Sequence, residues 1–128
     1  MVQVTEKNNK PAKINFTKRD VVIRQSEDGL VNRYKKYLID NYSFELKKIF
    51  IPIRGEGINL ETDGWIEETK TLIEAKSESS RENVRMAIGQ LYDYARYLKP
   101  TPKNLAILLP NPPSDDLSEL LFSQNINI

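Results

Sequence analysis

The sequence predicts an α/β domain in which a mixed central β-sheet is flanked by helices. Segments 27–41 and 81–98 repeat apolar residues at the spacing of amphipathic helices. Between them, segments 58–66 and 71–76 alternate apolar and polar residues, as strands do. A continuous apolar run over 104–109 is bounded by prolines, which is typical of a strand buried on both faces. The expected order is therefore helix, three strands, helix, strand, helix.

One domain accounts for most of the chain. Its 128 residues, 39% of them hydrophobic, are enough for one core but not for two. Residues 1–20 are polar and lysine-bearing and are too few to fold independently, so we expect a tail, a strand or a linker. Residues 21–128 form the single predicted domain.

The first helix and the first strand lie in the amino-terminal half of this domain. Apolar residues at helical spacing place the helix over 27–41. We expect a strand over 44–53, ended by Pro52 and by the turn over 54–57. The two glycines of that turn indicate an exposed loop, which we expect at the rim of a cleft.

The next two strands form a hairpin. With a turn centred on 67–70, Ile66 faces Thr71, and Asp63 then falls opposite Glu74. Their Cβ atoms would lie roughly 4.5 to 5.5 Å apart. Like charges directly opposite one another destabilise a sheet, so this arrangement favours a cation between the two carboxylates.

The second helix and the carboxyl-terminal elements complete the expected fold. Ser79 or Ser80 can cap the helix over 81–98. The remaining elements, in chain order, are the strand over 104–109, a short helix capped by Ser114 or Asp115 and ending at Phe122, and an edge strand over 126–128.

Two pairs of polar residues are placed together by this pattern. Glu74 and Lys76 share one face of their strand because side chains alternate between faces. Gln90 and Tyr94 are four residues apart, so they lie one turn apart on a common face of the helix that follows.

Ten residues separate Asp63 from the sequence Glu74-Ala75-Lys76. This spacing resembles the active-site signature of the PD-(D/E)XK nuclease superfamily, which has a restriction-endonuclease-like core (αβββαβ). Thr62 stands where the proline of that signature would be. Glu-x-Lys followed by Q-x-x-x-Y on the next helix is similar to the RecB-like branch, and the whole looks most like bacterial restriction-type endonuclease domains.

The resemblance implies a role for each matching residue. The catalytic residues would be Asp63, Glu74 and Lys76, with Lys76 orienting or deprotonating the attacking water. Asp63, Glu74, the Ala75 carbonyl and Glu27 would hold Mg²⁺ or Mn²⁺. Glu27 matches an additional helical acid that many members carry.

Substrate contacts are expected from four residues. The resemblance implies that Gln90 and Tyr94 face the nucleic acid near the metal. Arg81 and Arg85 follow the Glu-x-Lys strand closely, so we expect them to contact phosphate.

Each of these residues also has a purely structural interpretation. Gln90 can cap exposed backbone, and Tyr94 can be a half-buried core tyrosine. Lys76 can form an ordinary salt bridge to Glu74 or Asp63. Glu27 can be an acid in the first helical turn that interacts with the helix dipole.

Composition excludes several other kinds of site. The chain has no histidine and no cysteine, which excludes histidine bases, the usual serine and cysteine triads, zinc ribbons and disulfides. Only oxygen ligands remain for a metal, which favours magnesium or manganese. The net charge of +1 is low for a broad phosphate-binding surface, so positive patches around a cleft would have to be local.

These observations predict a divalent-metal-dependent DNA endonuclease of the restriction or defence type, with RNA a less favoured substrate. We expect a cytoplasmic protein without a membrane segment. A homodimer and a separate DNA-reading domain or subunit are compatible with the resemblance. The alternative is a catalytically silent nucleic-acid-binding or assembly module of a larger defence or repair system.

Overall fold

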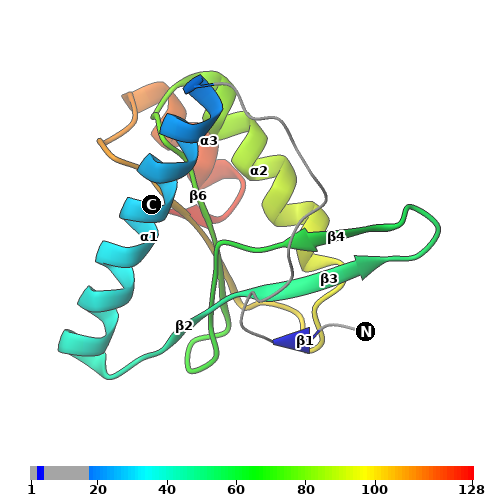
Figure 1. The fold of residues 1–128 in the computed structure, drawn as a ribbon. Coiled ribbons are helices and arrows are strands. Elements are labelled where there is room, and N and C mark those ends of the chain that lie inside the picture. The colour runs from blue at the N-terminus through cyan, green and yellow to red at the C-terminus, as the bar shows by residue number, and fades with distance from the viewer. Residues whose placement is uncertain (1–2, 5–17) are drawn as a thin grey trace.

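The computed structural model describes residues 3–4 and 18–128 and confirms an α/β fold with a mixed five-stranded sheet (Figure 1). Its helices are α1 (Lys18–Tyr42), α2 (Arg81–Ala95) and α3 (Asp115–Ser123). Its strands are β1 (Gln3–Val4), β2 (Leu46–Lys47), β3 (Ile49–Ile53), β4 (Ile58–Glu61), β5 (Gly64–Ile66), β6 (Thr71–Ala75), β7 (Asn104–Leu108) and β8 (Ile126–Asn127). No helix in the described ranges is long and apolar enough to cross a lipid bilayer.

The main sheet has the strand order β2-β5-β6-β7-β8. β2, β5 and β6 pair in antiparallel fashion, whereas β6, β7 and β8 are parallel. Parallel neighbours need a crossover connection, and α2 and α3 supply the two crossovers. A smaller sheet, in the order β1-β3-β4, lies beside the main one.

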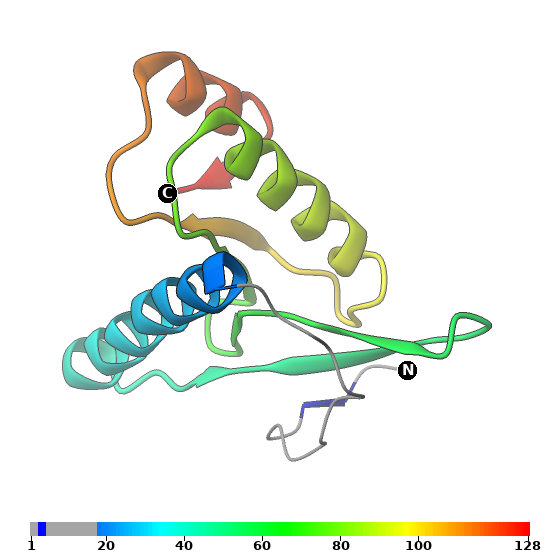
Figure 2. The same cartoon turned by 45° about the horizontal axis from the view of Figure 1, so that its top comes forward.

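The helices cover opposite faces of the main sheet (Figure 2). Leu72 points to the face that α2 and α3 cover, where it packs in one cluster with Leu91 and Leu121. The next residue, Ile73, points to the other face and packs with Val31 of α1. Burial of each such side chain contributes about 1.5–3 kcal/mol, so both faces of the sheet help to hold β6 in place.

Helix α1 is longer than the sequence predicts. It begins at Lys18 instead of residue 27, so it extends into the segment that we expected to be a tail, a strand or a linker. Part of that segment, β1, is a strand that pairs with β3. Residues 5–17 lie outside the described residues. The early start leaves Glu27 well inside the helix, so its interpretation as a first-turn acid is wrong.

The strand predicted over 44–53 is two strands, β2 and β3, which belong to different sheets. The strand predicted over 58–66 is likewise two strands, β4 and β5, which pair with β3 and β2. Pro52 does not end the strand, because it pairs with Asn59 inside β3. Together β3 and β4 form an arm that extends away from α1 (Figure 1). The turn over 54–57, with positive φ at both glycines, lies at the end of this arm.

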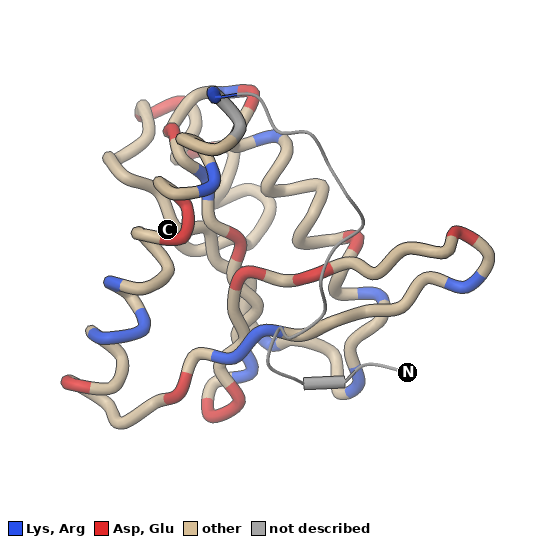
Figure 3. The backbone as a smooth tube through the Cα atoms, in the orientation of Figure 1, with Lys and Arg blue, Asp and Glu red and all other residues tan. Residues whose placement is uncertain are grey.

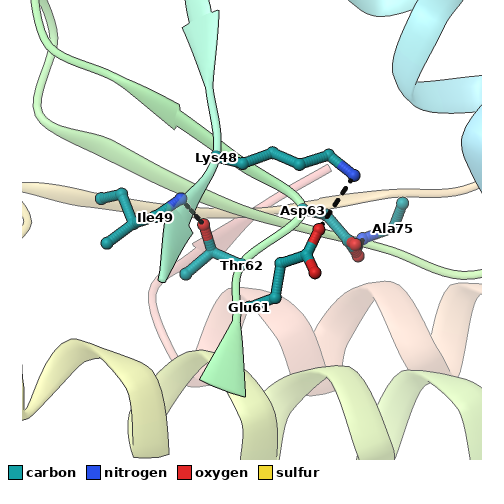
Figure 4. Close-up of polar contacts among 6 residues, drawn as sticks. All are labelled: Lys48, Ile49, Glu61, Thr62, Asp63 and Ala75. Atoms are coloured by element: carbon teal, nitrogen blue, oxygen red, sulfur yellow. Dashed lines mark hydrogen bonds and ion pairs between the residues drawn. The ribbon is translucent and has the colours of Figure 1, made fainter. Parts of the chain in front are cut away.

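A β-bulge marks the point where both strands change sheet. Lys47 pairs with Trp65 and Phe50 pairs with Glu61, so two residues of one strand oppose three of the other, 62–64. The fully buried Thr62 stabilises the bulge: its backbone N–H donates to the carbonyl oxygen of Ile49 (3.0 Å), and its Oγ1 accepts from the Ile49 N–H (3.1 Å; Figure 4). This bulge carries Asp63.

Gly64, the last residue of the bulge, has no room for a side chain. A Cβ there would lie 2.6 Å from Cδ1 and 3.1 Å from Cγ of the buried Leu46. We expect Gly64→Ala to lower the free energy of unfolding by about 1–3 kcal/mol in urea denaturation. Gly89→Ala is the matched control, because nothing lies within 4 Å of that Cβ position and a helical alanine should stabilise by up to ~1 kcal/mol. Equal stability of Gly64→Ala and wild type would contradict this packing.

The predicted hairpin register is confirmed. Ile66 pairs with Thr71 and Gly64 with Ile73, so Asp63 comes next to Glu74 at the end of the ladder. The turn between the strands includes Lys70 at a φ of 52°. Register therefore brings the two acids to the same end of β5 and β6.

The carboxyl-terminal elements follow the prediction with two differences. Ser80 and Ser114 cap α2 and α3, and β8 forms the edge strand. α2 ends at Ala95, three residues before the predicted end. The prediction that the strand over 104–109 is buried on both faces is wrong, since Ile107 alone is buried among its residues. On the α1 side, Ala106 and Leu108 are only partly buried against the cluster that contains Leu38, because an open groove lies between β7 and α1.

Candidate active site

A cavity of about 500 Å³ opens where α1, the bulge, the end of β6 and α2 meet. It brings together most of the residues that the sequence singled out: Glu27 from α1, Asp63 from the bulge, Glu74 and Lys76 from the end of β6, and Gln90 and Tyr94 from α2. Six further residues complete its lining: Arg24, Asp28, Val31, Asn32, Lys48 and Glu61. The loop over 54–57 does not line the cavity, so its expected place at a cleft rim is wrong.

Asp63 and Glu74 are held together by the end of the β5–β6 ladder. The backbone N–H of Ala75 donates to Oδ2 of Asp63 at 2.7 Å, which fixes the Asp63 carboxylate against β6 (Figure 4). Glu74 is only 4% exposed, and its Oε2 has no hydrogen-bond partner. A buried carboxyl oxygen without a partner is costly, so the geometry leaves one acceptor available for a cation or a water donor.

The pKa of the Glu74 carboxyl is raised from 4.5 to about 10, and burial is the main cause. The negative charge of Asp63 and a hydrogen bond between the two side chains contribute to this rise, whereas Lys76 opposes it. Such a hydrogen bond needs a proton between the carboxyls. Without a cation, the pair therefore holds a proton at neutral pH.

Lys76 is as buried as Glu74, with 5% of its surface exposed. Its backbone N–H donates to the Leu108 carbonyl (3.0 Å), which ties the end of β6 to β7. Its ammonium forms no ion pair with a carboxylate of the described residues, so the ordinary salt bridge considered for it is not formed. A buried ammonium beside a cavity is available to a charged ligand.

Glu27 faces the same cavity from α1. Burial raises the pKa of its carboxyl, the positive charge of Lys76 lowers it, and the negative charge of Asp63 raises it. The structure thus places this third acid within the electrostatic field of the other two.

Gln90 and Tyr94 reach the cavity from the sheet-facing side of α2. Gln90 Nε2 donates weakly to Tyr94 Oη (3.4 Å), while Gln90 Oε1 is buried without a partner. Gln90 therefore does not cap exposed backbone. Tyr94, 7% exposed, belongs to the hydrophobic core and lines the cavity at its hydroxyl end. Burial, together with the negative charge of Glu74, raises its pKa.

Arg81 and Arg85 are not brought into this cavity. They line a separate groove of about 540 Å³ between α2 and α3, where Arg81 pairs with Asp116 (2.5 Å). The helical repeat explains the difference: Arg81 precedes Gln90 by nine residues, which is two and a half turns, so the two side chains leave opposite sides of α2. The sequence prediction considered only their proximity to the Glu-x-Lys strand.

Asp28, Asn32 and Glu61 also line the cavity, although the sequence prediction did not single them out. Lys48 and Glu61 form an ion pair across the bulge (3.3 Å), which brings a cation and an acid to the cavity from the two bent strands (Figure 4). Asp28 and Asn32 lie one turn apart on α1, four residues in sequence. That spacing could have placed Asp28 and Asn32 on one face of the helix. The position of Lys48 at the cavity depends on a bend of the strand that the alternation of side chains does not reveal.

The chemistry of the cavity fits a hard divalent cation. Its oxygen donors would be the carboxylates of Asp63, Glu74 and, from α1, Glu27, whereas Ala75, whose carbonyl was expected to join them, is fully buried and does not line the cavity. The unpartnered Oε2 of Glu74 supports this fit. Among the described residues, no three Asp or Glu side chains gather into a preformed metal cluster.

The fold and the cavity define an α/β protein with paired acids and a buried lysine at the end of a hairpin. Comparisons of the chain with protein-family models, with curated proteins and with solved structures found no match.

Proposed function

We propose that the protein is a divalent-metal-dependent nuclease that hydrolyses phosphodiester bonds, with DNA as the substrate. The observation that carries the proposal is the buried Glu74, which lies beside Asp63, has one unpartnered carboxyl oxygen and precedes a buried lysine by two residues. The element order and the Gln90–Tyr94 pair agree with the PD-(D/E)XK resemblance and support the restriction-endonuclease-like core. These features together favour hydrolysis of a phosphate ester.

The side chains of the cavity would have separate roles in such a reaction. Asp63, Glu74 and Glu27 would hold Mg²⁺ or Mn²⁺, which polarises a phosphoryl group and lowers the pKa of bound water. Lys76 would hold the attacking water and stabilise the negative charge that develops on phosphate. Gln90 and Tyr94 would position the strand through the amide and the hydroxyl.

Metal binding should release a proton near neutral pH. The pKa of Glu74 is about 10, so its carboxyl is protonated below that pH and must lose the proton to bind a cation. We therefore expect the Mg²⁺ affinity to rise with pH, and titration calorimetry in buffers of different ionisation enthalpy to show about one proton released per ion at pH 7.5. An affinity that is independent of pH between 6 and 9 would contradict this assignment of Glu74.

The direct test is a cleavage assay with three substrates: supercoiled plasmid, linear duplex and single-stranded DNA. Each is incubated with the protein in Mg²⁺ or Mn²⁺, with EDTA and a Lys76→Ala variant as controls. Metal-dependent cleavage that disappears in both controls is the expected result. Nicking of the plasmid would indicate an endonuclease, and shortening of linear DNA from its ends an exonuclease.

Two outcomes would reject the proposal. Cleavage that persists in EDTA or in the Lys76→Ala variant would come from a contaminant or from another site. Intact DNA with retained metal-dependent binding would favour the alternative, a binding or assembly module without catalysis.

A further inference from the structure

The carboxyl-terminal half of α1 and the turn after it carry four aromatic side chains in a row. Tyr34 stacks on Tyr37 with 6.1 Å between ring centroids, and Tyr37 meets Tyr42 edge-on at 6.0 Å. Tyr42 in turn stacks on Phe44 at 5.4 Å. Ser43 adopts a φ of 56° between them, which turns the chain so that the last two rings come together. We call these four residues the aromatic row.

The aromatic row is exposed and borders a groove. Tyr37 and Tyr42 are 48% and 55% exposed, so large ring surfaces face solvent. The groove beside them, of about 500 Å³, has apolar walls and two amide side chains, Asn104 and Asn127. Contiguous exposed aromatic surface of this kind marks a binding surface more often than a solvated face.

The segment that carries the aromatic row has a positive net charge. Residues 33–48 contain five cations, Arg33, Lys35, Lys36, Lys47 and Lys48. They contain two acids, Asp40 and Glu45, so the segment has a net charge of +3 in a chain whose total is +1. Acids and cations are interspersed along this part of the chain (Figure 3), and the turn whose Thr69 lines the groove adds Glu67 and Glu68. A positively charged aromatic surface complements a nucleic-acid strand, because phosphates meet the cations while bases stack on the rings.

One stripe of α1 connects the candidate active site with the aromatic row. Glu27 and Val31 line the site cavity, and Tyr34 and Leu38, on the same stripe, line the groove. Seven residues separate Glu27 from Tyr34, so the row begins about 10 Å along the helix from the cavity. A strand that leaves the cavity along α1 would meet the rings directly.

We propose that the aromatic row binds single-stranded nucleic acid and leads that strand to the candidate active site. This inference rests on the proposed nuclease function and narrows its substrate to a single strand or a frayed end. Unpaired bases expose the ring faces that stacking needs, whereas the bases of a duplex are already stacked on one another. Binding through stacking is tolerant of base sequence, so affinity should vary little between oligonucleotides.

The test measures binding in EDTA, where cleavage cannot interfere, by the fluorescence anisotropy of a labelled oligothymidylate. We expect Tyr37→Ala and Tyr42→Ala each to weaken binding about tenfold, and Tyr37→Phe, which keeps the ring, to bind as wild type. Phe122→Ala is the matched control, because that ring is 83% exposed but lies on α3. Circular dichroism and thermal unfolding confirm that each variant is folded.

A second arm tests the charge. Lys35→Gln should reduce the slope of log affinity against log salt by about 0.7, whereas Lys99→Gln, exposed after α2, should leave it unchanged. Unchanged affinity in both tyrosine variants would overturn the inference. If plasmid cleavage continued in those variants, the proposed nuclease function would stand without it.

The remaining outcomes separate the two proposals. Wild type that cleaves duplex but does not bind single strands overturns the aromatic-row inference alone. Wild type that neither binds nor cleaves overturns both. If the alanine variants instead convert a concentration-dependent dimer to monomer in sedimentation, with unchanged oligonucleotide affinity, the row is a contact between two copies and the inference fails.

Discussion

Replacing Lys76 with methionine is expected to reduce metal-dependent cleavage by about 10²- to 10³-fold while the protein stays folded. The reduction follows from the loss of the ammonium that would stabilise charge on the phosphate. Methionine approximates the shape of the lysine stem, so it should fill the buried position without leaving a cavity. The measurement is initial cleavage rate together with urea denaturation of the same preparation.

The control for this variant is Lys103→Met, which changes an exposed lysine just before β7. Its cleavage rate should equal that of wild type. Wild-type activity in Lys76→Met would remove the central residue of the proposed mechanism. A loss of activity accompanied by unfolding would be a packing effect, and Lys76→Arg, which keeps the charge, would then be needed to separate the two causes.

Replacing Glu74 with glutamine is expected to abolish cleavage and to raise stability. Above pH 4.5 the unfolded chain loses the Glu74 proton, whereas the folded protein keeps it up to about pH 10. The free energy of unfolding therefore falls as pH rises through this range. Glutamine does not titrate and can still donate to Asp63, so the variant should be more stable than wild type by about 2–3 kcal/mol near pH 7.

The difference between this variant and wild type should depend on pH. It should be small near pH 4 and grow toward pH 9, as measured by urea denaturation across that range in EDTA. Glu119→Gln, an exposed change on α3, should alter stability by less than about 0.5 kcal/mol at every pH. A Glu74→Gln protein less stable than wild type at pH 8 would contradict the buried, protonated carboxyl. The expected result would show that Glu74 lowers the stability of the folded protein and is kept for its function.

Most of the fold could be predicted from the sequence because its signals are local. Turn position and strand alternation were enough to pair Ile66 with Thr71 and to bring Asp63 next to Glu74. The division of the segments 44–53 and 58–66 into two strands each was not predicted, because a bulge adds one residue without interrupting the run of apolar side chains. Gly64 inside the strand pattern was the available signal, since an interior glycine commonly marks a bulge.

The candidate site was predictable where its residues follow one another along the chain. Glu74, Lys76, Gln90 and Tyr94 lie on β6 and on the helix after it, so period and spacing were sufficient to group them. The contribution of Lys48 depends on the bend, which no local pattern encodes. Arg81 and Arg85 were misplaced although the helical repeat was sufficient to assign them to the other side of α2.

The bulge at Thr62 also separates two parts of the molecule that could otherwise disturb each other. A change in the pairing of the arm would, in a continuous ladder, pass along the strands and turn Asp63 to the opposite face. Here the bulge interrupts the strand pairing between the arm and the site, and the hydrogen bonds between Thr62 and Ile49 hold the bulge in place. The loop over 54–57 can therefore change in length or sequence, and acquire contacts of its own, while the two acids keep their positions.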